Sequence, residues 1–509
     1  MWPSRECASR LPPFSRATPR SMPGSMRKQN RSFAHSIAWN LAGAGIPLAF
    51  AFFAIPSLLA GYGNERFGLL TIIWALIGYF SIFDFGIGRA LTKLVSDRLG
   101  SNSKEDIHDV IKTALSTMAV LGLLACTLLI ATAPLIAEAL KLGASLRDES
   151  VLSLRILALG IPFVILSAGL IGLLEARAEF HAISQVRLLM GMLNFGAPLL
   201  MLTWSHSLVP ATIALAVARA ATTALYYQIS IRKGALDGGA GRFNRSNLRE
   251  LLGFGSWITL SNLISPLMAQ LDKVVIGSVV ALHLLPYYAV PGDLVNRLSF
   301  IPIALIGVFF PAFAAHWSAR ETDKLTSLYK SASFVMFSAV YPIALGIYLL
   351  APEGLSLWIG EQFSQQSTPL LHWLCVGLIL NSIARIPHAL LQAAGRPSIT
   401  AKLHLIELPI YAIALWQLLN HFGIIGAAIA WSGRMALDYI LLSVCSSISI
   451  PEVRRPSAFT LAAMIVGIAA MTTAALIPSP VLRLTLAVFF GIAGIALAAP
   501  VALRLRHND

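Results

Sequence analysis

Long apolar segments alternate with short polar loops along most of this chain. A helix needs about 20 predominantly apolar residues to cross the hydrocarbon core of a bilayer, and the pattern predicts about fourteen such helices. They are expected near residues 35–60, 67–91, 110–133, 151–174, 184–204, 209–231, 251–279, 285–313, 328–350, 369–394, 399–420, 424–446, 458–478 and 484–503. The sequence therefore predicts an all-α polytopic membrane protein.

One hydrophilic break divides the predicted spans. Residues 232–250 are glycine-rich and basic, and they separate the first six spans from the next six. We expect a basic, disordered cytoplasmic tail over 1–32, an N-terminal six-helix lobe over 33–231 and a C-terminal six-helix lobe over 251–446. Residues 447–509 then hold two additional transmembrane helices and a short cytoplasmic tail.

Two similar segments relate the predicted lobes to each other. LLEARAEFHAISQVRLL begins at Leu173, and LLQAAGRPSITAKLHLI begins at Leu390, about 216 residues later. Each contains a polar turn and leads through two predicted spans to an arginine, Arg219 or Arg434. Internal duplication of this kind is common in transporters. It predicts two six-helix lobes in a pseudo-twofold arrangement, with two extra C-terminal helices outside the repeat.

The composition agrees with a membrane protein. Charged residues make up only 12% of the chain, whereas soluble domains carry about 25%. The net charge of +14 is explained by topology, because basic residues concentrate in the cytoplasmic loops of membrane proteins. With a cytoplasmic N-terminus, the outward loops hold only four basic residues, Arg66, Lys141, Arg147 and Arg483. Both termini are then cytoplasmic, and no nucleic-acid partner is expected.

The motif search argues against an enzyme. The four cysteines, Cys7, Cys126, Cys375 and Cys445, form no C-x-x-C pair, so neither a disulfide framework nor a zinc site is indicated. The sequence contains no Walker A loop, zincin motif, nucleophile elbow or dinucleotide fingerprint. We therefore expect no catalytic residue, no metal and no cofactor, apart from a coupling cation such as H⁺ or Na⁺.

Charged residues inside the predicted spans are the candidates for a functional site. A charge at the bilayer centre costs about 2.5–3.5 kcal/mol on the insertion scale, so such residues normally face a cavity or each other. The candidates for binding a diphosphate in the cavity are Arg89, Arg219, Arg297, Arg385, Arg434 and Lys273. The candidate coupling or charge partners are Asp84, Asp272, Asp293 and Asp438. Arginine suits a diphosphate because its planar fork donates two hydrogen bonds at once and keeps its charge.

Two of these acids stand four residues from an arginine and could bridge to it on one helix face, Asp293 to Arg297 and Asp438 to Arg434. Such a pair either allows a polar helix to insert or lines a substrate cavity, and both interpretations stay open. Arg89, Arg219 and Arg385 have no acid at this spacing, which favours an external anion, although Arg89 could also pair with Asp84.

Two acids could bind the coupling cation. Asp272 follows a nearly uncharged span, and its charge could instead be neutralised by Lys273 or by a neighbouring helix. Glu407 lies beside Pro409, which kinks the helix and frees a backbone carbonyl, and it is the weaker candidate.

Three motifs resemble a known family. FDFGIGRALTKLVSD at 83–97, LDKVVIGSVVALHLLPYYAVPGDLVNRLSFIPIALIGVFFPAFA at 271–314 and GRPSITAK at 395–402 are similar to the polysaccharide transporter family. These are the Wzx-type oligosaccharide flippases of the multidrug/oligosaccharidyl-lipid/polysaccharide (MOP) flippase superfamily. The resemblance covers roughly residues 30–446 in layout.

The resemblance implies a transporter of the inner membrane. Its two lobes would surround a central cavity that opens alternately to each side. They would move a polyprenyl-diphosphate-linked oligosaccharide to the outer leaflet, for synthesis of exopolysaccharide, O-antigen or capsule. Membrane lipids, a polysaccharide polymerase and other assembly proteins are the expected partners. The family motifs carry Asp84, Arg89, Asp272, Lys273, Asp293 and Arg297 as cavity residues, whereas Arg219, Arg385 and Arg434 rest on the charge argument.

Two alternatives remain open at this point. A cation-coupled multidrug or metabolite exporter of the same superfamily would favour an acidic cavity, whereas basic residues prevail in the predicted spans here. A membrane-embedded glycan polymerase or ligase would favour a long outward loop with catalytic arginine or histidine, and every predicted outward loop is short.

Overall fold

The computed structural model describes residues 25–100, 105–140, 142, 144–236 and 241–507. Within these ranges the chain is helical, with no strand. Residues 1–24 of the predicted disordered tail lie outside them, and 25–32 already belong to the first helix. The α-helices are α1 (Ser25–Phe80), α2 (Ile87–Gly100), α3 (Glu105–Ala139), α4 (Ala144–Ala158), α5 (Ile161–Ala176), α6 (Phe180–Leu202), α7 (Leu208–Arg232), α8 (Arg245–Val279), α9 (Leu285–Arg297), α10 (Phe300–Ser318), α11 (Thr322–Leu349), α12 (Ala351–Trp358), α13 (Glu361–Ala393), α14 (Pro397–Phe422), α15 (Ile424–Ser449), α16 (Arg454–Ala474) and α17 (Pro480–His507). Three short 3₁₀ helices join them, η1 (Ser81–Asp84), η2 (Leu282–Leu284) and η3 (Pro451–Val453).

Eleven segments of the described chain are long and apolar enough to cross a membrane. The predicted all-α membrane fold is therefore confirmed, while the count of fourteen spans stays a prediction. One reason for the difference is α1, which joins the predicted span 35–60 to the first part of the predicted span 67–91. The predicted span 67–91 is itself interrupted, because α1 ends at Phe80 and η1 and α2 follow. At Gly63 the backbone takes φ 71° and ψ 167°, a left-handed conformation that glycine adopts at little cost. This residue bends the chain without a separate loop.

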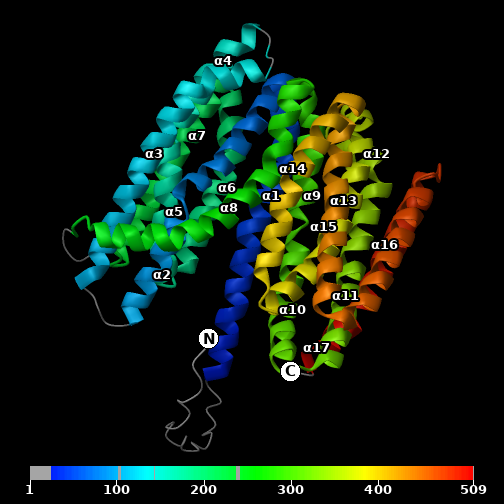
Figure 1. The fold of residues 1–509 in the computed structure, drawn as a ribbon. Helices are drawn as coiled ribbons and strands as arrows, with labels where there is room; N and C mark the ends of the chain where they lie inside the picture. Colours follow the sequence, from blue (N-terminus) through cyan, green and yellow to red (C-terminus); the bar gives the residue numbers. More distant parts are fainter. Residues whose placement is uncertain (1–24, 101–104, 141, 143, 237–240, 508–509) are drawn as a thin grey trace, which may run out of the picture.

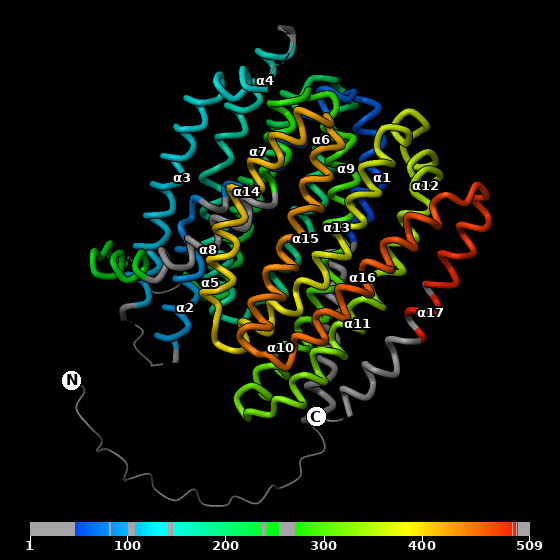
Figure 2. The backbone as a smooth tube through the Cα atoms, turned by 45° about the vertical axis from the view of Figure 1, so that its right-hand side comes forward, coloured from blue at the N-terminus to red at the C-terminus, as the bar shows by residue number. Residues whose placement is uncertain are grey.

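The helices form two groups that stand side by side in Figure 1. The first group contains α2–α7 together with α1, and its main contacts join α1 to α6, α6 to α7, α3 to α5 and α4 to α7. The second group contains α9–α15 packed around α13, which contacts α9, α10, α11, α12 and α15. Figure 2 shows α16 and α17 at the outer edge of this group, where both pack on α11.

The two similar sequence segments adopt the same local structure. In the first, α5 ends at Ala176 and α6 begins at Phe180, with a left-handed Ala178 in the turn between them. In the second, α13 ends at Ala393 and α14 begins at Pro397, with a left-handed Gly395 in the turn. The arginines that follow the repeat therefore lie on corresponding helices, Arg219 on α7 and Arg434 on α15.

Helix α8 connects the two groups. Asn244 caps its first turn by accepting a hydrogen bond from the Ser246 amide, so the helix starts inside the predicted 232–250 linker. The Arg242 amide donates to Asp109 on α3, which fixes the end of the linker to the first group. From there α8 crosses between the groups and packs on α1, α2 and α3 as well as on α14 (Figure 1).

The two groups touch each other at the end of the molecule where α1 bends. Asn64 donates to the hydroxyl of Tyr287 at 2.9 Å. The Phe52 and Trp358 rings stack with their centroids 4.6 Å apart, and the Trp358 indole donates to the Phe52 carbonyl. The start of α1 and the end of α17 both lie at the opposite end (Figure 1).

Candidate functional site

A polar cavity of about 620 Å³ lies between the two groups of helices. Its wall comes from α1 and α6 on one side and from α8, α9, α13, α14 and α15 on the other. Among the described residues, the charged ones on this wall are four basic ones, Lys273, Arg297, Arg385 and Arg434, and two acidic ones, Asp293 and Asp438. With the histidines counted as neutral, these described residues sum to an excess of two positive charges.

All six of these residues were candidates from the sequence. The helices bring them to one place although they are spread from residue 273 to residue 438. Between them the wall carries neutral polar side chains, Asn194, Gln270, Asn296 and Asn381, and two indoles, Trp74 and Trp431. The sequence reasoning missed this second set because it considered only charge. Asparagine and glutamine inside apolar spans were the available signal, since they too are costly to bury unless they are hydrogen-bonded.

Lys273 is paired across two helices rather than with its neighbour in the sequence. Its ammonium donates to Asp293 on α9 at 2.8 Å. The adjacent Asp272 is held differently, because one oxygen accepts from the Lys273 backbone amide and the other from the Tyr288 hydroxyl. Asp272 thus has hydrogen bonds both from the next residue and from α9, and its predicted role in binding a coupling cation stays a prediction.

Two of the cavity arginines, Arg297 and Arg434, lie against aromatic rings. The Arg297 guanidinium lies 5.6 Å from the centre of the Phe195 ring, which belongs to α6 in the other group. The Arg434 guanidinium lies 5.3 Å from the centre of the buried Tyr411 ring on α14. A cation over an aromatic face is stabilised by the ring quadrupole. These contacts help to position the two guanidinium groups on the cavity wall.

Arg385 lies on the cavity wall, whereas Arg219 lies behind it. Arg385 projects from α13 onto the cavity wall, and its buried Nε has no hydrogen-bond partner among the described residues. Arg219 lies behind the wall, where it donates to the side-chain oxygen of Asn194 at 3.0 Å. Asn194 itself lines the cavity, so Arg219 reaches the site through this residue.

Arg89 and Asp84 lie away from the cavity. The chain turns through η1 and the left-handed residues Phe85 and Gly86, and Asp84 accepts a hydrogen bond from the Gly86 amide. Arg89 follows on α2 with an exposed side chain, and neither residue belongs to the cavity wall. The role of Arg89 in substrate binding and that of Asp84 as a coupling or charge partner therefore stay predictions, outside the cavity described here.

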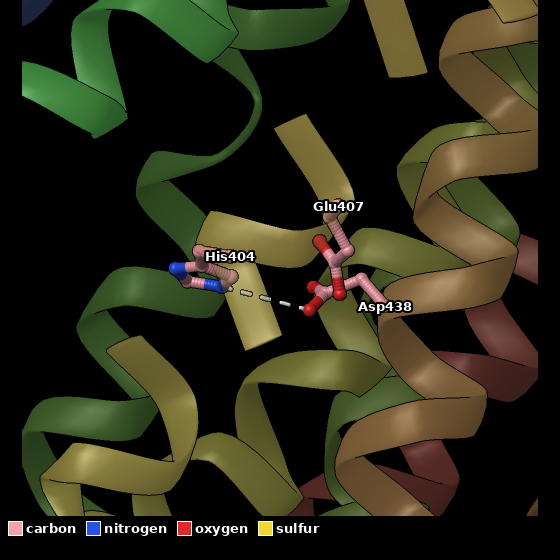
Figure 3. A group of neighbouring side chains, drawn as sticks. All are labelled: His404, Glu407 and Asp438. Atoms are coloured by element: carbon pink, nitrogen blue, oxygen red, sulfur yellow. Dashed lines mark ion pairs between the residues drawn. The ribbon is translucent and has the colours of Figure 1, made fainter. Parts of the chain in front are cut away.

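A cluster of three titratable side chains adjoins the cavity (Figure 3). His404 and Asp438 lie on its wall, and His404 Nε2 is 3.6 Å from Asp438 Oδ1. Glu407, one turn further along α14, is fully buried, and neither of its carboxylate oxygens has a hydrogen-bond partner among the described residues. Of the three, the sequence reasoning gave weight to Asp438 and some to Glu407, and it missed His404.

The comparisons with known proteins agree with this architecture. Residues 63–368 match the model of the family described as "Polysaccharide biosynthesis protein". A protein of Shigella flexneri named "Putative O-antigen transporter" is 28% identical over 414 residues, which cover 81% of this chain and 97% of that protein.

Two solved structures share the fold. An inward-facing multidrug resistance transporter of the MATE family and the MOP superfamily aligns with a TM-score of 0.70 over 82% of this chain and 99% of its own, at 16% identity. The lipid II flippase MurJ, in an inward closed conformation, aligns with a TM-score of 0.65 over 92% of this chain and 99% of its own, also at 16% identity.

The family match and the Shigella relative, together with the multi-span helical fold, identify a membrane transporter of the flippase type. The chain belongs to the polysaccharide biosynthesis protein family, whose model covers more than half of it. This family is one of transporters and flippases rather than of catalytic enzymes, which confirms the assignment that the resemblance implied.

Proposed function

We propose that this protein moves a polyprenyl-diphosphate-linked oligosaccharide across the inner membrane by alternating access. The observation that carries the proposal is the excess of basic residues in one cavity between the two helix groups. A diphosphate bears negative charge that must be compensated when it leaves water. Arg297, Arg385 and Arg434 would supply that compensation with paired, directional donors.

The remaining lining residues suit the glycan. Sugars present hydroxyl groups that donate and accept hydrogen bonds, and the amides of Asn194, Gln270, Asn296 and Asn381 can do both. The indole faces of Trp74 and Trp431 offer apolar surface for a sugar ring. The polyprenyl tail would stay in the bilayer while the headgroup occupies the cavity.

The arrangement of the two groups suggests the direction of opening. They touch near Asn64 and Tyr287, at the end opposite to the start of α1 and the end of α17. With both termini in the cytoplasm, as the distribution of basic residues favours, the contact closes the outer side. Rocking of the groups would break this contact and expose the headgroup to the outer leaflet.

The proposal also includes a driving force for transport and partner proteins that receive the product. A cation gradient, H⁺ or Na⁺, or the membrane potential acting on the charged cavity would drive the transition between the two states. A polysaccharide polymerase and other assembly proteins would receive the product in the synthesis of exopolysaccharide, O-antigen or capsule. The Shigella relative, which is named as an O-antigen transporter, supports this setting.

One observation favours a second candidate function. The fold aligns with a multidrug resistance transporter, so a cation-coupled exporter would have the same architecture. Such an exporter of cationic compounds would need an acidic cavity, and here four basic residues face two acidic ones. The charge of the cavity therefore favours the anionic substrate.

A binding experiment tests the proposal. Native mass spectrometry of the purified protein would compare a polyprenyl diphosphate with the polyprenyl alcohol of the same length. We expect the diphosphate to bind and the Arg385→Ala variant to lose about tenfold or more in affinity, because one charge-assisted contact contributes about 1.5–3 kcal/mol. The Arg147→Ala variant is the control, since Arg147 pairs with Glu138 on the surface. Equal binding of the alcohol and the diphosphate would contradict the proposal.

A further inference from the structure

The cluster of His404, Glu407 and Asp438 has the composition of a metal site. His404 and Glu407 are three residues apart on α14 and therefore lie on one face of that helix, and Asp438 faces them from α15 (Figure 3). One potential ligand atom from each side chain lies within 4.8 Å of those of the other two. One imidazole and two carboxylates thus converge on a common point between two helices.

Glu407 is buried without a hydrogen bond to its carboxylate from the described residues. Its exposed fraction is 0%, and both of its oxygens lack a hydrogen-bond partner among the described residues. Asp438 is 9% exposed, and its Oδ1 also lacks a hydrogen bond, because the 3.6 Å separation from His404 exceeds hydrogen-bonding distance. Two adjacent carboxylates without such bonds are costly to bury unless a proton or a cation compensates them.

We propose that His404, Glu407 and Asp438 bind one divalent first-row metal ion, Zn²⁺ or Mn²⁺. Imidazole together with carboxylate is a common ligand set for such ions. With ligand bonds of about 2.0–2.2 Å, two ligand atoms on one ion are at most about 4.4 Å apart. Small side-chain rotations that bring the three ligand atoms within that limit would therefore form the site.

The ion would stand at the edge of the cavity. His404 and Asp438 belong to the cavity wall, and Glu407 lies behind them. The ion would therefore be bound by Glu407 on the protein side and would be accessible from the cavity. Three protein ligands leave a further coordination position open, as in catalytic zinc sites. This position would face the cavity and accept an oxygen atom. That the oxygen comes from the substrate diphosphate is the part of the inference that rests on the proposed function.

Positive groups surround the site and provide the competing explanation. Arg434 and Arg385 are close enough to interact electrostatically with Glu407 and Asp438, respectively. The His388 ring from α13 stacks on His404, with the ring centres 5.9 Å apart. If these arginines and a shared proton already compensate the carboxylates, the site takes no metal. A direct binding measurement separates the two cases.

The experiment is a titration of the purified full-length protein with Co²⁺ alone. The protein is purified with an affinity tag that contains no histidine. Bound Co²⁺ reports its ligands through visible absorption bands, and Zn²⁺ added afterwards should displace it. We expect one saturable site per chain in the wild type. Glu407→Gln and His404→Asn should each weaken binding about 100-fold or more, because even residues outside the first ligand sphere contribute 10–100-fold.

His421→Asn is the matched control, since His421 is an exposed histidine on the same helix, and it should bind as the wild type does. Gel filtration of each variant checks that it is folded, and Asp438→Asn replaces any variant that is not. Absence of a saturable site in the wild type, or unchanged binding in folded Glu407→Gln and His404→Asn, would overturn the inference. Because the titration contains no glycan lipid, its result is independent of whether the proposed substrate is correct.

Discussion

Lys273 on α8 donates a 2.8 Å hydrogen bond to Asp293 on α9, and the two partners differ in their access to water. The Lys273 side chain is 8% exposed and the Asp293 side chain 37%. Loss of either partner leaves the other with an unpaired charge, but only Lys273 would hold that charge away from solvent. The pair therefore joins α8 to α9, and we expect the stability of the protein to depend more on Asp293 than on Lys273.

From this asymmetry we predict that Asp293→Asn lowers the unfolding free energy by about 3 kcal/mol, because it leaves a buried ammonium without its partner. Lys273→Met should cost less, since the remaining Asp293 reaches the water of the cavity. The double variant should be more stable than Asp293→Asn alone. Thermal unfolding of the four proteins in one detergent measures this order. Equal losses in the two single variants would show that burial of Lys273 does not decide the effect.

A second prediction concerns the contact between the two helix groups. A Cβ atom added at Gly68 on α1 would lie 2.4 Å from the Leu282 carbonyl oxygen of η2, so Gly68→Ala cannot fit without separation of these elements. We expect a lower yield of chemical crosslinks between cysteines introduced at Asn64 and Tyr287, in a background without the native cysteines. The expected loss of stability is about 1–3 kcal/mol.

Gly78→Ala provides the control for that experiment, because no heavy atom of the described residues lies within 4 Å of a Cβ at this position of the same helix. Its crosslink yield should match that of the parent protein. A Gly68→Ala variant that crosslinks as well as Gly78→Ala would contradict the close approach of α1 and η2.

The third prediction separates charge from hydrogen-bond geometry at Arg385. Arg385→Ala should reduce transport more than tenfold, because it removes a cation from the cavity wall. Arg385→Lys should retain part of the activity, since lysine keeps the charge but loses the planar fork that fits a phosphate. Transport per molecule of expressed protein, measured beside Arg147→Ala, tests the order. Wild-type transport by Arg385→Ala would remove this residue from the site.

The fourth prediction concerns Arg89, which was predicted from the sequence to bind the substrate but does not lie on the cavity wall. The sequence placed Arg89 and Arg385 in one set of substrate-binding arginines, but only Arg385 lies on the cavity wall. Arg89→Ala should therefore change transport less than twofold, whereas Arg219→Ala should reduce it through the loss of its contact with Asn194. The same transport assay compares them at equal protein levels. A severe defect in Arg89→Ala would mean that α2 enters the pathway in another state.

The all-α membrane fold could be predicted from the sequence, because membrane-spanning helices are recognised by their length and hydrophobicity. The paired segments from Leu173 and Leu390 also led to equivalent helix–turn–helix units. The bend at Gly63 was not predicted, because a helix that continues across a left-handed glycine looks like two spans with a loop. The apolar segments and the two polar turns of the repeat could be located, but the continuous passage of the helix through Gly63 could not.

The site was predicted only in part, for a different physical reason. Charge in an apolar helix identified Lys273, Arg297, Arg385 and Arg434, which the structure brings to one cavity. The partner of Lys273 could not be predicted, because a tertiary contact with Asp293 takes the place of local pairing. His404 escaped notice since a lone histidine in a span carries no pattern of its own, and its neighbours become visible only when α14 and α15 are packed together.

The most direct test of the proposed transport function is the fate of the lipid-linked oligosaccharide in a strain that lacks this gene. The diphosphate-linked intermediate should accumulate in the cytoplasmic leaflet and disappear when the wild-type protein is restored. The Arg385→Ala variant, produced at the same level, should leave it in place. If no intermediate accumulates and the strain instead becomes sensitive to cationic drugs, the protein is an exporter and the flippase function is wrong.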